Sequence, residues 1–294
     1  MKCSIGVFAY NEEKNIARLL EALLKQKLEK VEISEIIIIA SGCTDDTVLI
    51  AREFIKKDKR IKLLIQKKRE GKFSAINLFL KTASSKILVI QSGDTISHEN
   101  AIEELVRVFK NKSIGMAGTR PVPVNRKDCF WGFLANILWG LHHEISLKTP
   151  KTGEMVAFLN DFPGLKPTSV DEALIESWFK NHGFEIVYVP SAIVYNKGPE
   201  NLRDFLAQRR RIHYGHLDLK NQENYQVSTM DSFKIFLLLR KIIKRNPDLR
   251  KSWFWLFGVI GLEAWARGLG IYDFYFKKNN HIVWKRINST KNLE

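Results

Sequence analysis

The amino-acid sequence predicts an α/β fold in which a mostly parallel central sheet lies between helices. Short aliphatic runs alternate with segments whose apolar residues recur at helical spacing. The runs at 35–40 and 87–90 are almost wholly aliphatic, as expected for strands buried on both faces of a sheet. Polar loops follow the first four runs, and parallel strands bring such loops together at the sheet edge where ligands bind.

The first half of the chain supplies most of this sheet. Strands are expected at 4–9, 35–40, 61–66, 86–90 and 114–119, and the loops after the first four read AYNEE, SGCTDD, KKREGK and QSGDT. Apolar positions predict helices at about 16–24, 47–57, 73–80 and 102–109. The amide oxygen of Asn11 is a suitable cap for the first helix, because it can accept a hydrogen bond from a free backbone N–H.

The second half is expected to be richer in helix. The long aromatic segment 130–147 is a core helix, or a helix at a membrane surface or acceptor groove. A strand at 152–158 precedes a helix that begins at Asp171 and ends at Gly183, and another strand follows at 184–190. The run 253–262 ends at charged residues, and neither it nor the basic amphipathic segment 233–245 is long enough to span a bilayer. Both segments suit either a helical cap on the domain or an anionic lipid surface.

Composition restricts the class of protein. The 294 residues include 47 Lys and Arg against 32 Asp and Glu, a net charge of +15. Residues 197–294 hold 19 basic and 9 acidic side chains, or +10 of that total, which indicates an anionic partner: phosphates, nucleic acid or a membrane. The three cysteines lack metal-site spacing, and the first residues do not resemble a signal peptide. We therefore expect a cytoplasmic protein, with peripheral contact at the cytoplasmic membrane face as an open alternative.

Asp94 is the first candidate for a functional residue. It follows the aliphatic run 87–90 through a short polar stretch, which places its carboxylate just beyond a buried strand. This position predicts a ligand for a divalent metal. Alternatively, Asp94 and Thr95 only turn the chain and cap a helix that starts near Ser97.

The four loops together resemble the nucleotide-sugar half of a family 2 glycosyltransferase with the GT-A fold. The resemblance rests on the YNE stretch at 10–12, the DGSTD-like stretch at 41–45 and the DxD-like turn at 92–94. It implies binding of a nucleotide-diphosphate sugar donor and of Mn²⁺ or Mg²⁺. Serines replace the family's first aspartate in two motifs, so one carboxylate remains for the metal; phosphate oxygens and water can complete such a site. The residues implied for donor and metal in this half are Tyr10, Glu12, Ser41, Asp45, Lys72, Ser92 and Asp94.

Three later motifs extend the resemblance to about residue 214. Asp171 and Glu172 match the family's acidic motif, in which one carboxylate removes a proton from the acceptor hydroxyl, and either of the two can take that role. Gly153 corresponds to the acceptor side. Gln208 and Arg211 match QxxRW, which implies acceptor contact by Gln208 and diphosphate contact by Arg211. Ile212 replaces the tryptophan of that motif, which weakens the case for processive polymer synthesis.

The resemblance thus predicts an inverting glycosyltransferase acting on a glycan or lipid-linked acceptor. We expect a GT-A domain at 1–230, with a nucleotide-sugar half at 1–120 and an acceptor half at 121–230. A basic, aromatic helical extension would follow at 231–294, and its ending resembles that of complete soluble family members. Two alternatives remain. One is a nucleic-acid-binding protein that uses the arginines at 209–211 and the C-terminal lysines, although nucleic-acid binding would not explain why the buried strands end in acids. The other is an inactive membrane-docked scaffold of the same fold.

Overall fold

A computed structural model of the chain describes residues 1–225, 227, 238, 253–277 and 281–293. The strands are β1 (Lys2–Ala9), β2 (Glu32–Ser41), β3 (Ile61–Gln66), β4 (Ile87–Ser92), β5 (Ile96–Ser97), β6 (Ile114–Pro123), β7 (Met155–Leu159) and β8 (Glu185–Asn196). The α-helices are α1 (Ile16–Leu24), α2 (Thr47–Lys57), α3 (Lys72–Thr82), α4 (Ala101–Arg107), α5 (Phe130–Ser146), α6 (Asp171–Asn181), α7 (Leu202–Glu223) and α10 (Trp253–Tyr272). Shorter helical segments lie at Val108–Lys110, Asp273–Lys277 and Asn288–Thr290.

The strands form one sheet in the order β3-β2-β1-β4-β7-β6-β8-β5. The first four positions pair in parallel, with Ile5 of β1 opposite Ile36 of β2 and Val89 of β4. The short strand β7 runs antiparallel to both β4 and β6, while β6 and β8 are parallel. The predicted mostly parallel sheet is therefore confirmed, and the loops after β1, β2, β3 and β4 lie at one edge.

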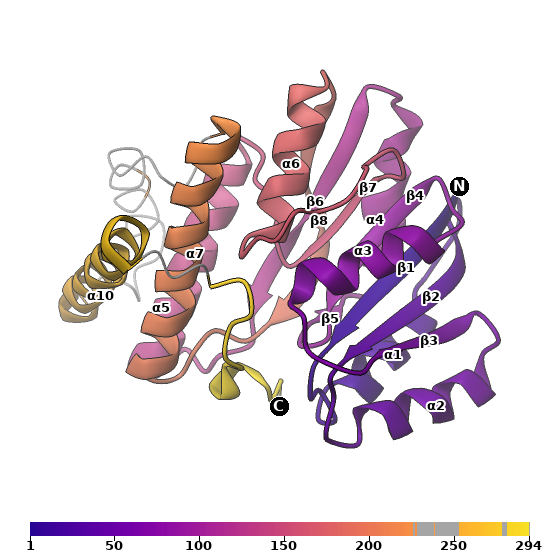
Figure 1. Ribbon diagram of the computed structural model, residues 1–294, viewed down its shortest axis with the longest axis horizontal. Coiled ribbons are helices and arrows are strands. Elements are labelled where there is room, and N and C mark those ends of the chain that lie inside the picture. Colours follow the sequence, from indigo (N-terminus) through magenta and orange to yellow (C-terminus); the bar gives the residue numbers. More distant parts are fainter. Residues whose placement is uncertain (226, 228–237, 239–252, 278–280, 294) are drawn as a thin grey trace.

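Helices cover both faces of the sheet, as the alternating pattern predicts (Figure 1). Helices α1, α2 and α4 bury Leu19, Phe54 and Leu105 against one face. Helices α3 and α6 bury Phe79 and Phe179 against the other. Apolar side chains thus enclose the central strands from both sides, which explains why these strands read as continuous aliphatic runs.

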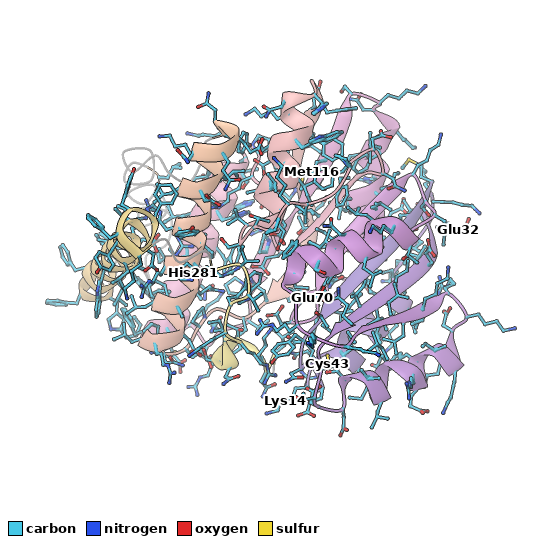
Figure 2. All side chains as sticks on the ribbon, in the orientation of Figure 1. Lys14, Glu32, Cys43, Glu70, Met116 and His281 are labelled. Atoms are coloured by element: carbon cyan, nitrogen blue, oxygen red, sulfur yellow. The ribbon has the colours of Figure 1, made fainter. Side chains whose placement is uncertain are left out.

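Helices α5, α7 and α10 build a further apolar cluster beside the sheet. Phe133 and Ile137 of α5 pack with Phe205 of α7 and Val259 of α10. In Figure 1, α10 lies on the outside of the molecule next to α7, and all the described side chains of this region are drawn in Figure 2. Residues 130–146 therefore form part of the core, one of the two roles expected for that segment.

Asn11 does not cap the first helix. Its backbone is left-handed, with φ 55°, and its side-chain oxygen accepts a hydrogen bond from the Thr44 N–H at 2.8 Å. The helix begins at Ile16, with Asn15 in the capping position. The expectation failed because Asn11 ties the loop after β1 to the loop after β2, and this contact between loops is not visible in a local pattern.

The segment after Asp94 also differs from the prediction. Ile96 and Ser97 form strand β5, which pairs antiparallel with β8, and the helix begins only at Ala101. Because β8 lies about 100 residues away in sequence, nothing local indicates that two residues here complete a sheet edge.

The C-terminal apolar run is longer than predicted. Glu263 and Arg267 do not end it, because the helix continues to Tyr272. The Arg209 guanidinium donates to both carboxylate oxygens of Glu263, at 2.8 and 2.6 Å, so the charge is paired against α7. The stretch Phe254–Lys277 is long and apolar enough to cross a membrane by length and composition, and 17% of its most apolar 18-residue window is buried. The predicted segment 233–245 and the boundary at 230/231 fall largely or wholly outside the described residues.

Candidate active site

A cavity of about 570 Å³ opens at the sheet edge where the first four strands end. Residues from both halves of the chain line it. All the predicted site residues except Asp45 are among them: Tyr10, Glu12, Ser41, Lys72, Ser92, Asp94, Gly153, Asp171, Glu172, Gln208 and Arg211. The fold therefore brings together residues that are up to about 200 positions apart in sequence.

Tyr10 and the loop after β3 form one wall of the cavity. The Arg69 guanidinium lies 4.0 Å from the centre of the Tyr10 ring, a cation–π contact. Gly42 has φ +65°, and a Cβ there would come within 2.7 Å of the Arg69 backbone nitrogen. The loops after β2 and β3 can approach so closely only because residue 42 is glycine.

Asp45 lies outside this wall. Its Oδ1 accepts hydrogen bonds from the Thr47 N–H at 3.1 Å and the Thr47 hydroxyl at 2.5 Å, and its Oδ2 accepts from the Glu13 N–H at 3.2 Å. The carboxylate thus caps the start of α2 and fixes the loop. Nucleoside contact by Asp45 stays a prediction.

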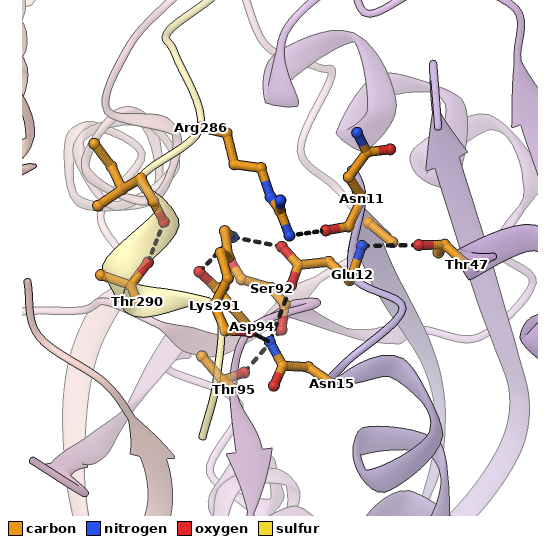
Figure 3. A network of polar contacts seen from close by, with 12 residues as sticks. Asn11, Glu12, Asn15, Thr47, Ser92, Asp94, Thr95, Arg286, Thr290 and Lys291 are labelled. Carbon is orange, nitrogen blue, oxygen red and sulfur yellow. Dashed lines mark hydrogen bonds and ion pairs between the residues drawn. The ribbon is translucent and has the colours of Figure 1, made fainter. Parts of the chain in front are cut away.

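Asp94 lies just beyond β4, as predicted, but a lysine from the far end of the chain contacts it. The Lys291 ammonium donates to Asp94 Oδ2 at 2.7 Å and also to Glu12 Oε1. Figure 3 shows Lys291 between the two carboxylates. Asn15 donates to Glu12 Oε2 at 3.1 Å and to the Lys291 carbonyl at 3.0 Å, which holds acid and lysine together.

The electrostatics of this cluster follow from its burial. Burial raises the pKa of Glu12 to about 7, against the opposing effect of the Lys291 ammonium. For Asp94, burial also acts upward, but the charge and hydrogen bond of Lys291 hold its pKa below the usual value. The pKa of Lys291 is raised by the two carboxylates, despite burial. Lys291 therefore places a positive charge against the carboxylate predicted to bind a metal.

Among the described residues, no group of three or more His, Cys, Asp or Glu side chains is arranged to hold a metal ion. Two of the cavity acids are instead bonded to lysine, Glu12 to Lys291 and Glu172 to Lys72. A divalent ion at Asp94 would therefore draw most of its ligands from substrate and water.

Asp171 and Glu172 begin α6 and line the same cavity. Lys72, at the start of α3, donates to Glu172 Oε1 at 2.5 Å. Although burial opposes it, Lys72 holds the pKa of Glu172 below its usual value. Asp171 is 2% exposed, and its Oδ1 has no hydrogen-bond partner among the described residues. Burial, with the neighbouring Glu172 charge, raises the pKa of Asp171 to about 7, so the two carboxyls differ in character.

Glu154 is a cavity acid that the sequence reasoning missed. It follows Gly153 in the loop before β7, which begins at Met155 rather than at the predicted residue 152. Its backbone is left-handed, with φ 61°, a conformation uncommon for a residue other than glycine. Burial, together with the charges of Asp94 and Glu172, raises its pKa to about 7. In the sequence, only its position next to Gly153 could have indicated that Glu154 lines the cavity.

The arginines of α7 have separate roles. Arg211 lines the cavity, donates to the Ser169 carbonyl at 3.1 Å and lies 4.1 Å from the centre of the Trp284 ring. Arg209 pairs with Glu263, and Arg210 pairs with Asp273. Two of the three arginines that nucleic-acid binding would use are thus engaged within the protein.

The segment 281–293 supplies the remaining residues that sequence reasoning missed. It adds Trp284, Arg286 and Lys291 to the cavity wall, and Arg286 donates to the Asn11 carbonyl. In Figure 1 the yellow C-terminal segment runs from the α7 side toward the N-terminal half. The sequence HIVWKRINSTK carries no motif that would place it at the donor site, because the placement depends on contacts with residues about 280 positions away.

This architecture is that of the GT-A fold class: a mostly parallel sheet whose strand ends meet, across one cavity, the acids at the start of α6. A profile of the family described as Glycosyl transferase family 2 matches residues 4–157, just over half of the chain. The protein belongs to this family.

Curated relatives include the glycosyltransferase AglE of Haloferax volcanii, 28% identical over 115 residues, which are 39% of this chain and 38% of that protein. Poly-beta-1,6-N-acetyl-D-glucosamine synthase of Staphylococcus aureus is 26% identical over 244 residues, which are 78% of this chain and 58% of the synthase. The chain thus spans less than two thirds of the length of either relative.

Solved structures share the fold. The mannosyltransferase PcManGT from Pyrobaculum calidifontis, in complex with GDP-Man and Mn²⁺, superposes with a TM-score of 0.68 at 16% identity and covers 94% of this chain and 88% of its own. Glucosyl-3-phosphoglycerate synthase from Mycobacterium tuberculosis, in complex with Mn²⁺, UDP and glucosyl-3-phosphoglycerate, gives 0.52 at 17% identity, with 77% of this chain and 81% of its own covered. The chain is thus a glycosyltransferase by family and GT-A by fold.

Proposed function

We propose that the protein is an inverting glycosyltransferase that moves a sugar from a nucleotide-diphosphate sugar to a hydroxyl of a glycan or lipid-linked acceptor. One observation carries the proposal. Asp94, at the end of a parallel strand, and the pair Asp171 and Glu172, at the start of α6, face one cavity that also holds Arg211. A donor diphosphate near Asp94 and Arg211 would present its sugar toward the acids of α6.

In this proposal Asp171 is the base. Its Oδ1 has no hydrogen-bond partner among the described residues, and a pKa of about 7 suits a group that accepts a proton near neutral pH. Asp171 takes the proton of the acceptor hydroxyl, whose oxygen forms a bond to the anomeric carbon as the bond to the diphosphate oxygen breaks. The electron pair leaves with the nucleoside diphosphate, and attack from the opposite face inverts the configuration. Glu172 is a positioning residue: its carboxylate accepts a hydrogen bond from Lys72 and so holds the lysine in the cavity.

Donor contacts follow from the cavity wall. Tyr10, with Arg69 against its ring, and Ser41 would hold the nucleoside, and Ser92 and Lys72 lie on the diphosphate side. The guanidinium of Arg211 suits a diphosphate leaving group because its donors form a fixed fork. Gly153 and Gln208 would face the acceptor.

Mn²⁺ or Mg²⁺ is the proposed cofactor, with Asp94 as its carboxylate ligand. The site fits a hard cation, because Asp94 Oδ2 and Glu12 Oε1 already converge on one positive charge. Two solved structures of this fold contain Mn²⁺, which supports the proposal. When bound, the ion would stabilise the negative charge of the departing diphosphate.

The acceptor side adjoins apolar surface. Leu138 and Ile145 of α5 and Ile260 of α10 also line the cavity, and the outer side of α10 exposes Phe257. We propose that α10 contacts a membrane surface and that the acceptor is presented from there.

The test is a panel of UDP- and GDP-sugars incubated with the full chain, with Mn²⁺, with Mg²⁺ and with a chelator, and scored for transfer or slow hydrolysis. We expect turnover of at least one donor when Mn²⁺ or Mg²⁺ is present. Asp94→Asn should lower that turnover by about 100-fold or more, because it removes a charge that the site is built around. An unaltered rate in this variant would remove the metal assignment. Absence of turnover with every donor would favour the inactive scaffold.

A further inference from the structure

The side chain of Lys291 occupies the site proposed for the metal. Its ammonium donates a hydrogen bond to Asp94 Oδ2 at 2.7 Å and another to Glu12 Oε1, and the side chain is 16% exposed. We infer that Lys291 is an internal cation that competes with the divalent ion for Asp94 and Glu12, so that metal binding must displace it. The inference rests on the proposed function and describes how metal binding at the same site is controlled.

Charge is the reason for competition. An ammonium and a divalent ion cannot both lie against one carboxylate oxygen without strong repulsion, which partial burial increases. Removing Lys291 without a replacement would leave Glu12, 3% exposed, next to the Asp94 charge. The lysine therefore keeps the two acids neutralised until another cation arrives.

The anchoring of segment 281–293 explains how Lys291 can be displaced without moving the backbone. His281 contacts Asp273 at 2.7 Å, and the Ser289 hydroxyl donates to Asp204 at 2.6 Å. Neither contact involves the donor site. The backbone of 281–293 can thus stay in place while the long, flexible side chain of Lys291 swings away from the acids.

This arrangement has a consequence for the order of binding. A free divalent ion meets an occupied pair of carboxylates, whereas an ion that arrives with a diphosphate brings its own oxygen ligands and offers the released ammonium a phosphate partner. Lys291 would therefore weaken binding of the metal alone relative to metal with nucleotide.

The experiment measures Mn²⁺ affinity of the nucleotide-free full chain by electron paramagnetic resonance of free Mn²⁺. Lys291→Met should bind Mn²⁺ about tenfold more tightly or better than the wild type, because a competing cation is gone. Lys291→Arg retains the charge and should remain weak. Lys285→Met is the matched control, since it removes an exposed lysine of the same segment that lies outside the cavity. Equal or weaker Mn²⁺ binding by Lys291→Met would overturn the inference.

A second measurement uses the wild type and so does not depend on whether the variant folds. Amine acylation followed by peptide mass spectrometry should show that Mn²⁺ increases the labelling of Lys291 several-fold, with Lys285 as the internal reference. Unchanged labelling would overturn the inference as well. Both measurements need neither donor nor acceptor. Tight Mn²⁺ binding by Lys291→Met, together with no transfer by the wild type from any donor, would contradict the proposed function alone. Mn²⁺-dependent transfer by the wild type without that gain in affinity would contradict this inference alone.

Discussion

At the scale of single residues, the two adjacent acids of α6 differ through one neighbour. Lys72 donates to Glu172 at 2.5 Å and leaves Asp171 Oδ1 without a partner among the described residues. The sequence leaves either acid as the base, but local chemistry gives Asp171 the more basic carboxylate. A sequence shows which acids are adjacent and not which one a lysine 100 residues away will hold.

The pH dependence of transfer distinguishes the two acids. A base acts only when deprotonated, and burial raises the pKa of Asp171 to about 7. With Asp171 as the base, kcat/KM should be level above about pH 7 and fall about tenfold per unit below it. If Glu172 were the base, its lowered pKa would extend the plateau well into the acidic range.

Variants test the same assignment. Asp171→Asn should lower kcat by about 10² to 10⁴-fold. Glu172→Gln should keep a base but lower its apparent pKa, because a negative neighbour is lost and Lys72 is released. The midpoint of its pH profile should therefore move downward. A normal rate in Asp171→Asn, or an unmoved midpoint in Glu172→Gln, would contradict the assignment.

At the scale of elements, strand and helix positions in the first half could be predicted because periodicity and burial agree. The predicted bounds 47–57 and 61–66 match α2 and β3. Errors occurred where distant partners decide the outcome. Strand β5 exists through β8, and Asn11 is turned toward the loop after β2 instead of capping α1. In α10, Glu263 reads as a stop but is paired with Arg209.

Helix α5 depends on a glycine at its first turn. A Cβ at Gly132 would lie 1.6 Å from the Arg126 carbonyl oxygen, a backbone atom that cannot rotate away. Gly132→Ala should therefore destabilise the protein by about 1–3 kcal/mol and lower the thermal midpoint. Gly261→Ala in α10 is the control. Nothing lies within 4 Å of its added methyl group, so it should leave the midpoint unchanged or raise it slightly. Equal effects of the two substitutions would show that the close approach does not matter.

At the scale of the whole molecule, the family motifs in the sequence predicted most of the residues of those motifs that line the cavity. The wall formed by 281–293 could not be predicted, because Trp284, Arg286 and Lys291 reach the site through the course of the whole chain. The same holds for Glu154, which depends on a left-handed backbone next to Gly153. Family resemblance therefore predicted residues that line one cavity, while the arrangement of its charges required the structure.

The uneven charge and the exposed α10 together predict membrane binding by the whole molecule. Phe254, Phe257 and Phe276 are 70%, 63% and 75% exposed, and +10 of the net charge of +15 lies in residues 197–294. Aromatic side chains beside basic ones favour anionic bilayers. The full chain should float with vesicles that contain phosphatidylglycerol, much less with phosphatidylcholine alone, and less as salt is raised.

The double variant Phe254→Ser and Phe257→Ser should lower this binding by about tenfold or more, because it removes two apolar side chains from the buried face of the contact. Leu49→Ser is a matched control, since Leu49 is 59% exposed on α2, among the helices that cover the N-terminal part of the sheet. Co-flotation, with lipid-bound protein measured on gels, distinguishes the two. Equal binding to neutral vesicles, or an unaffected double variant, would assign the exposed face of α10 to another partner.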